Sequence, residues 1–146
     1  MMGIPLYILA TFAKTDHVVG RDQNAPEAGL KLYLIGAAST AITLFGMSLV
    51  VGLSGSTSIA AIAGTAPTPL FALGILMVLA GMGFKIGVAP FHMWVPDTYQ
   101  GSSTPFVAFL SVAPKGAGLA ALFTLFHLGF AAHASTWTPA LLGLTT

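Results

Sequence analysis

The sequence predicts an all-α protein, a polytopic bundle of transmembrane helices. Five Lys or Arg and four Asp or Glu residues make up only 6% of the 146 residues, whereas soluble domains carry about 25%. Apolar residues make up 55% of the chain, and the mean hydropathy is +0.89. A soluble domain needs a charged surface to stay dispersed, so this composition indicates a chain embedded in lipid or in a larger membrane assembly.

The N-terminal part combines a short apolar segment with the main cluster of charge. Residues 1–13 are apolar but too short to span a bilayer, so we expect a partial helix there. Residues 14–31 hold most of the charged residues and predict an aqueous loop. No charge occurs from Leu32 to Phe84, and residues 30–53 form the first full transmembrane helix that we predict.

Two further transmembrane helices are predicted over residues 70–95 and 105–130. Residues 54–69 contain Gly, Ser, Thr and Pro and predict a loop, and residues 96–104 predict a short connector. The tail, residues 131–146, mixes polar and apolar residues and predicts a loop or the start of another helix. The fold class is therefore about three full helices plus a partial first one.

The orientation of the bundle follows from the basic residues of its loops. Lys14, Arg21 and Lys31 occupy or flank the first loop, whereas residues 54–69 and the tail have no Lys or Arg. Basic residues concentrate in cytoplasmic loops. We therefore predict that the first loop and the 96–104 connector face the cytoplasm.

The composition also excludes several classes of function. A net charge of +1 offers no basic patch for phosphates, so we expect no nucleic-acid partner. The sequence has no cysteine, which removes disulfides, thiolate metal sites and iron–sulfur ligation. The histidines lack clustered carboxylates, so we expect no metal site.

Two lysines inside the later apolar helices are the strongest candidates for function. Lys85 lies a few residues past the middle of the second predicted helix, and Lys115 a few residues before the middle of the third. Because these helices are antiparallel, both lysines are expected about 4 Å to the same side of the midplane, at ~1.5 Å per residue. A charge in a lipid-exposed helix costs roughly 2.5–3.5 kcal/mol, so such residues face a bundle interior or a water-filled path.

Apolar surroundings and a neighbouring positive charge both favour a neutral amine. We therefore predict that Lys85 and Lys115 exchange protons near neutral pH. The alternative is that each ammonium group simply reaches water along an apolar surface.

The segment after Lys85 carries further candidates. Pro90 is expected to break the helix, and broken membrane helices expose backbone groups that must line a polar cavity. His92 titrates near neutrality and either relays protons or has no such role. We interpret Trp94 and Tyr99 as interface aromatics, and a helix cap is one alternative for Asp97.

Residues 83–122 carry a long pattern, G-F-K-x-x-x-x-P-F-H-x-W-x-P-D-x-Y-x-G-x-x-T-P, followed by a second lysine. This run resembles the family of subunit N of bacterial NADH–quinone oxidoreductase (respiratory complex I), whose counterpart elsewhere is subunit 2. Upstream, IPLYILA and EAGLKLYLIGAASTAITLFGMSLV are similar to two earlier helices of that family. The resemblance thus covers most of the chain.

The resemblance implies that residues 1–146 are a fragment of an antiporter-like, proton-conducting membrane domain with inverted repeats of helices. In that family a glutamate pairs with the first lysine, and by the alignment of motifs this glutamate would fall one residue before Met1. Carried over by motif, Lys85 would be the central lysine of a broken helix and Lys115 its partner in the next helix. The resemblance also implies a possible relay or helix-break role for Pro90, His92, Asp97 and Lys31.

The implied function is proton translocation, driven by electron transfer in partner subunits and carried by the two buried lysines. The chain would be a non-redox subunit of an NADH:quinone oxidoreductase, a translocase of the respiratory chain, and is not expected to be active alone. NADH, FMN, iron–sulfur clusters and quinone would be bound by partner subunits, and none by this chain. The implied partners are the other membrane subunits of complex I and the lipid bilayer, in a bacterial plasma (inner) membrane.

Two other functions fit the same residues. One is a cation/proton antiporter or membrane-bound hydrogenase subunit, which sodium dependence of transport would distinguish. The other is a non-conducting structural scaffold, in which the lysines only pair with partner groups or lipid phosphates and no proton moves.

Overall fold

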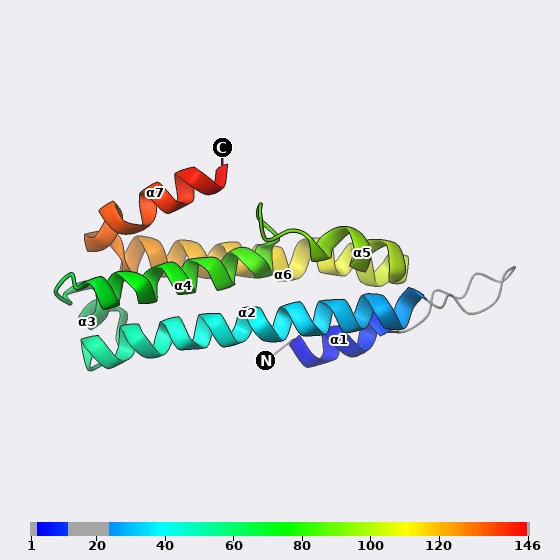
Figure 1. Cartoon of the computed structure of the whole chain (residues 1–146), viewed down its shortest axis with the longest axis horizontal. Coiled ribbons are helices and arrows are strands. Elements are labelled where there is room, and N and C mark those ends of the chain that lie inside the picture. Colours follow the sequence, from blue (N-terminus) through cyan, green and yellow to red (C-terminus); the bar gives the residue numbers. More distant parts are fainter. Residues whose placement is uncertain (1–2, 12–23, 146) are drawn as a thin grey trace, which may run out of the picture.

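Long apolar helices dominate the structure. The computed structural model describes residues 3–11 and 24–145, and within these ranges it contains seven α-helices and no strand. Three described stretches are long and apolar enough to cross a membrane: Ala25–Ser54, Pro69–Ile86 and Thr104–Gly129. They lie side by side in an elongated bundle (Figure 1). The predicted all-α transmembrane fold is therefore confirmed.

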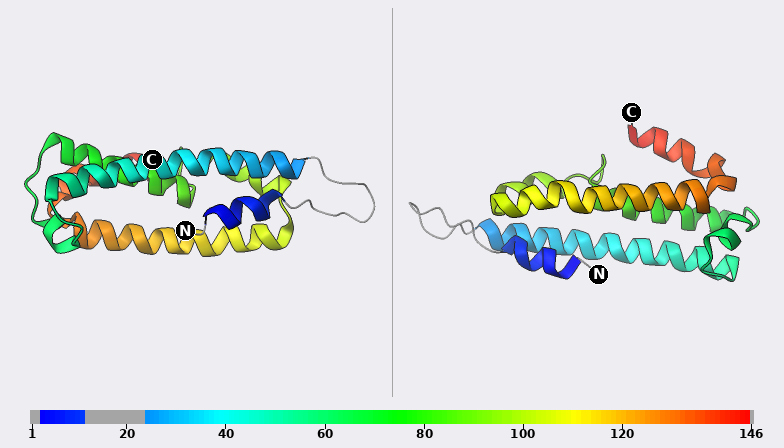
Figure 2. Two further views of the ribbon diagram at one scale, coloured as in Figure 1. Left: turned by 90° about the horizontal axis from the view of Figure 1, so that it is seen from below. Right: turned by 180° about the vertical axis from the view of Figure 1, so that it is seen from behind.

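The first two helices pair along part of their length. Helix α1 (Gly3–Thr11) lies against the first half of α2 (Asn24–Ser54), as both views of Figure 2 also show. Helix α2 begins at Asn24 and not at residue 30, because Asn, Pro and Glu at positions 24, 26 and 27 all favour a helix start. The predicted aqueous loop therefore ends earlier than expected, and its residues 14–23 lie outside the described part of the chain.

The helix predicted over residues 70–95 is broken. Helix α4 (Pro69–Ile86) has Thr68 as its N-cap, and the Thr68 side chain accepts a hydrogen bond from the Phe71 amide at 3.2 Å. It ends at Gly87, and after an irregular stretch the chain enters α5 (Trp94–Gly101). The break near Pro90 is thus confirmed, although the last helical residue, Ile86, already lies four residues before the proline.

Gly87 ends α4 because its backbone is left-handed, with φ +78°. Glycine adopts this conformation without the steric cost that a Cβ brings. The amide groups of Gly87 and Val88 both donate to the Gly83 carbonyl, at 2.9 and 3.1 Å. These bonds satisfy the Gly83 carbonyl, one of the groups that the end of a helix otherwise leaves free.

Two segments predicted as loops contain helix, and the tail, predicted as a loop or the start of another helix, is helical. Residues 54–69 include α3 (Ile59–Ala63), most of the 96–104 connector belongs to α5, and the tail forms the 3-10 turn η2 (Ala131–His133) followed by α7 (Ala134–Thr145). Helix α7 folds back onto α4 (Figure 1). Each of these short helices gains from packing on the bundle, which local composition does not reveal.

The third long helix, α6 (Thr104–Thr124), continues through the π-helical turn η1 (Leu125–Gly129). Two hydrophobic clusters hold the bundle together. One, near α3, gathers Val50, Ile62, Phe71, Ile75, Val78, Leu79, Phe126 and Phe130, and the other, near α5, gathers Ala10, Leu32, Trp94, Phe106 and Leu110. Large apolar side chains on the outside of α2 and α6, such as Leu44 and Val112, are exposed, as suits helices that face lipid.

Between the clusters, α2 and α4 approach closely at Gly81. The hydroxyl of the buried Ser39 donates to the Gly81 carbonyl at 3.1 Å. A Cβ at Gly81 would lie 2.9 Å from the Ser39 carbonyl oxygen and would also collide with Thr43. Glycine is therefore required for this approach, which small residues commonly permit between membrane helices.

Candidate functional site

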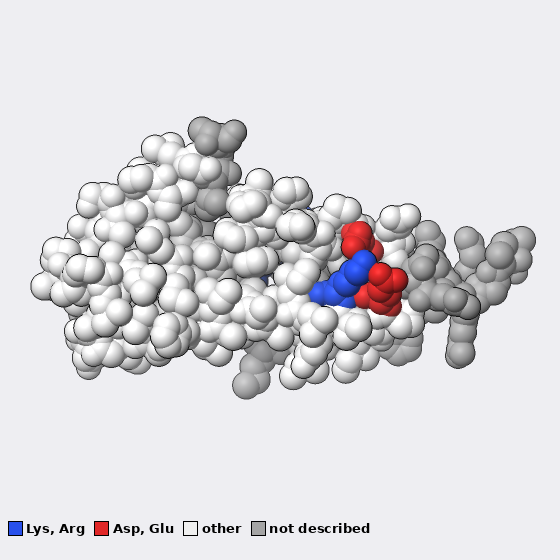
Figure 3. All heavy atoms as spheres, in the orientation of Figure 1, with Lys and Arg blue, Asp and Glu red and all other residues white. Residues whose placement is uncertain are grey.

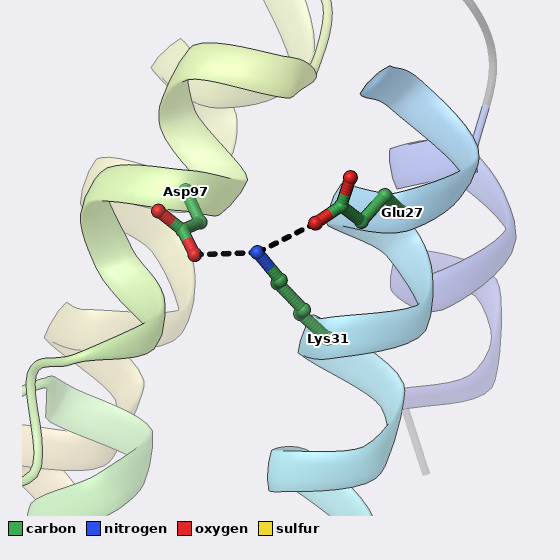
Figure 4. A network of polar contacts seen from close by, with 3 residues as sticks. All are labelled: Glu27, Lys31 and Asp97. Atoms are coloured by element: carbon green, nitrogen blue, oxygen red, sulfur yellow. Dashed lines mark hydrogen bonds and ion pairs between the residues drawn. The ribbon is translucent and has the colours of Figure 1, made fainter. Parts of the chain in front are cut away.

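Charged side chains gather at the end of the bundle where α2 begins and α5 lies. On the face that Figure 3 shows, they form mainly one patch, and most of the remaining surface is uncharged. The Lys31 ammonium group lies 2.8 Å from Glu27 and 2.8 Å from Asp97 (Figure 4). Glu27 lies one turn before Lys31 on α2, whereas Asp97 comes from α5. The Lys31–Asp97 ion pair therefore joins two helices.

This ion pair brings together two of the residues that the sequence singled out. The side chains of Lys31 and Asp97 are 42% and 52% exposed, so water and salt screen the pair. Asp97 lies in the first turn of α5, where a negative charge is favourable. It is not the helix cap that the sequence left as one alternative, because the N-cap position belongs to Met93.

The helix break is bridged by Trp94. Its indole N–H donates to the Phe84 carbonyl in the last turn of α4, at 3.1 Å. Trp94 is only 6% exposed and belongs to the cluster near α5. Its interpretation as an interface aromatic is therefore wrong, since it ties α5 to the end of α4.

Lys85 lies in the last turn of α4, directly before the break. The carboxyl end of a helix carries partial negative charge, so a cation is favoured there. Its side chain is exposed among the described helices, which leave this side of α4 uncovered, and the expectation of a buried lysine stays a prediction. Pro90 and His92 lie in the stretch between α4 and α5 and are also exposed.

Lys115 is half-buried on α6 and lies over an aromatic ring. Its ammonium nitrogen is 5.5 Å from the centroid of the Tyr99 ring. One turn further along α6, a Cβ at Gly118 would lie 3.0 Å from Ile86. Helices α4 and α6 therefore touch within one turn of both Lys85 and Lys115.

Sequence reasoning missed two parts of this site. Gly87 ends the helix, and a glycine followed three residues later by a proline was the available signal. Tyr99 is half-buried and packs against the cluster near α5, and is not a plain interface aromatic. Trp94, Thr98 and Gly101 are buried at helical spacing in α5, but Thr and Gly are not apolar, so the sequence carried no clear signal of this packed helix.

Two hydroxyl groups of α5 are buried in the site. Neither the Thr98 hydroxyl nor that of Tyr99 has a hydrogen-bond partner among the described residues. Within the same described part of the chain, no group of three or more His, Asp or Glu residues is placed to hold a metal ion. The site thus consists of lysines, the two carboxylates that pair with Lys31, and aromatic side chains.

Comparison with known proteins shows which family this chain is similar to. The family described as "NADH:quinone oxidoreductase/Mrp antiporter, TM" matches residues 1–146. The NADH-quinone oxidoreductase subunit N of Trichlorobacter lovleyi is 42% identical over 145 residues, covering 94% of this chain and 28% of the relative. The NAD(P)H-quinone oxidoreductase subunit 2 of Prochlorococcus marinus (strain MIT 9303) is 46% identical over 139 residues, covering 93% of this chain and 25% of the relative.

A solved structure is similar as well. A chain of respiratory complex I from Thermus thermophilus with bound aureothin has a TM-score of 0.71 and 41% identity, covering 83% of this chain and 26% of that one. This chain thus spans about a quarter of the length of the proteins that it matches. The family match and the three apolar spans identify an integral membrane protein. The chain belongs to the NADH:quinone oxidoreductase/Mrp antiporter transmembrane family.

Proposed function

We propose that this chain forms part of the proton-conducting membrane domain of an NADH–quinone oxidoreductase, with Lys85 and Lys115 as its proton-transfer residues. One observation carries the proposal: the break in α4 leaves Lys85 at a helix end, and α4 touches α6 within one turn of Lys115. Relatives named subunit N and subunit 2, at 42% and 46% identity, support this enzyme. The coupled reaction belongs to the whole complex, in which this chain would be a non-redox part.

The exposed position of Lys85 indicates on which side of α4 protons would pass. A lysine among membrane-spanning helices is stable where a further polar group or water faces it. The carbonyl groups at a helix break add to this polar environment, since broken helices in membranes line cavities. We therefore place the proton path along the exposed side of α4, beside α6.

Repulsion between the two ammonium groups would drive proton transfer. Two like charges on touching helices destabilise each other, so a proton gained by Lys85 favours proton loss from Lys115, and the reverse. A charge that changes elsewhere in the complex during quinone reduction would shift this balance. NADH, FMN, iron–sulfur clusters and quinone would bind to partner subunits.

The location follows from the same proposal. Relatives come from bacteria, so we assign the chain to a bacterial plasma membrane, next to other membrane subunits of the complex. The start of α2 and the helix α5 lie at one end of the bundle, which we assign to the cytoplasmic side because Lys31 lies there.

Substitution of the lysines in the intact respiratory complex tests the proposal. We expect Lys85→Ala and Lys115→Ala to lower proton pumping in membrane vesicles about tenfold or more, because a lost proton-transfer group has effects of that order. Ser111→Ala is the matched control, since among the described residues its hydroxyl donates to the Ala108 carbonyl of its own helix and to no other helix. Unchanged pumping in Lys85→Ala would show that this residue has no such role.

Arginine variants separate proton transfer from a purely structural role. Arg keeps the positive charge but does not release its proton in proteins. We expect Lys85→Arg and Lys115→Arg to pump as poorly as the Ala variants. Normal pumping by both Arg variants would favour the non-conducting scaffold.

The identity of the transported ion needs one further measurement, because the family description also includes Mrp antiporters. We expect pumping in vesicles to be the same with sodium or potassium as the only added cation. Transport that requires sodium would assign the chain to a cation/proton antiporter.

A further inference from the structure

We infer that Tyr99 is a positioning residue for Lys115, and that its ring holds the lysine ammonium group in place for proton transfer. This inference rests on the proposed function of Lys115. It assigns a role to α5, the short helix after the break, that the motif residues alone do not indicate.

The contact itself has the geometry of a cation–π interaction. The Lys115 nitrogen lies 5.5 Å from the Tyr99 ring centroid, within the reach of about 6 Å over which a ring face attracts a cation. A lysine stem has four rotatable bonds and would otherwise place its ammonium group in many positions. The ring favours one of them, on the α5 side of α6.

The ring can do this because α5 is anchored to two other helices. Asp97, two residues before Tyr99, pairs with Lys31 of α2, and Trp94 donates to the Phe84 carbonyl of α4. Tyr99 also packs against the hydrophobic cluster near α5, which includes Phe106 of α6. Helix α5 thus connects all three membrane-spanning helices and presents the ring from a position held on several sides.

The ring of Tyr99 and its hydroxyl group can be tested separately for their effect on Lys115. The attraction to the ammonium group comes from the electron-rich face of the ring, which phenylalanine shares. The Tyr99 hydroxyl is buried and has no hydrogen-bond partner among the described residues, so no protein contact within that range depends on it. The inference therefore predicts that Phe replaces Tyr99 and that an aliphatic residue does not.

A series of fluorinated residues at position 99 of the intact complex tests the ring contact. Phenylalanine and its mono- and trifluorinated forms have nearly the same shape, but each fluorine withdraws electrons from the ring face. We expect Tyr99→Phe to pump within about twofold of the native complex, and pumping to fall stepwise with fluorine number. The total loss should be about three- to thirtyfold, the range that a cation–π contact supports. The same substitutions at Tyr33, whose ring packs in a T-shaped contact with Tyr7 and not against Lys115, should have no graded effect on pumping.

A second measurement reports the position of Lys115 without relying on pumping. In the detergent-solubilised complex with labelled lysine, the ring should shift the NMR signal of the Lys115 ε-methylene group. We expect this shift to persist in Tyr99→Phe and to vanish in Tyr99→Leu. A signal that is the same in the native complex and in Tyr99→Leu would overturn the inference.

The outcomes separate this inference from the proposed function. Pumping that needs Lys115 but stays level across the fluorinated series would overturn the role of Tyr99 and leave the lysine in place. Normal pumping in Lys115→Ala would overturn the proposed function, and with it the use of Tyr99 in proton transfer.

Discussion

Replacing Gly87 by alanine tests how the end of α4 is specified. A left-handed backbone costs a residue with a Cβ about 1–2 kcal/mol, and Gly87 has φ +78°. Alanine loses less chain entropy on folding than glycine, and this difference raises the free energy of unfolding by about 0.4–1 kcal/mol. The difference is a loss of about 1 kcal/mol in the free energy of unfolding. The new Cβ would also lie 3.1 Å from the Val95 side chain, so a small shift of α5 would add to this loss.

A second Gly→Ala change provides the matched control. Gly116 lies inside α6, and a Cβ there would have no other atom within 4 Å. Alanine in a helix interior is more favourable than glycine by about 0.5–1 kcal/mol, so Gly116→Ala should stabilise the chain. The same chemical change is therefore expected to have opposite signs at the two positions.

Reversible unfolding of the full chain in mixed detergent micelles measures both effects, with circular dichroism as the signal. In a Trp137→Phe background, Trp94 fluorescence gives a second, local signal, because its indole bridges the helix break. Gly87→Asn should lose less stability than Gly87→Ala, since Asn tolerates the left-handed region better. If both Ala variants shift the unfolding midpoint equally and in the same direction, the reasoning from φ is wrong.

Two further predictions concern contacts between helices. In the same micelle assay, Ser39→Ala should lower the free energy of unfolding by about 1 kcal/mol, because its buried hydroxyl donates across to α4. Ser48→Ala is the control: its hydroxyl is exposed and bonded within α2, so the change should be less than about 0.5 kcal/mol. Asp97→Asn should speed amide hydrogen exchange in α5 by removing the ion pair to Lys31, and high salt should bring the native chain closer to the variant. Glu27→Gln should leave exchange in α5 unchanged, since its ion pair lies within α2, and an equal effect of both substitutions would contradict this role of Asp97.

Parts of the fold followed from composition because lipid restricts the choices of a chain. Backbone groups in a bilayer must bond within their own segment, so long apolar runs have to be helices. The three spans and the break near Pro90 were predictable for this reason. The site was predictable only as a set of candidates, since Lys31, Lys85, Asp97 and Lys115 stood out as charges in an apolar chain.

The short helices were not predictable from local pattern. Helix α5 contains a proline, an aspartate and a glycine, which together indicate a turn. It is helical because Trp94 and Thr98 are buried on one side and Trp94 bonds to α4. Helix α7 likewise depends on packing against α4. A short helix has too few internal bonds to be stable alone, so its formation depends on contacts that lie elsewhere in the sequence.

The sequence by itself determined which segments cross the membrane and that one of them is broken, because length, hydropathy and helix-ending residues act locally. Only the tertiary structure decided which side chains meet. Lys31 and Asp97 are 66 residues apart in sequence, and Lys115 meets Tyr99 from another helix. Such pairs depend on how each helix is rotated and how closely it approaches its neighbour, as at Gly81, and that geometry arises from the packing of the whole bundle.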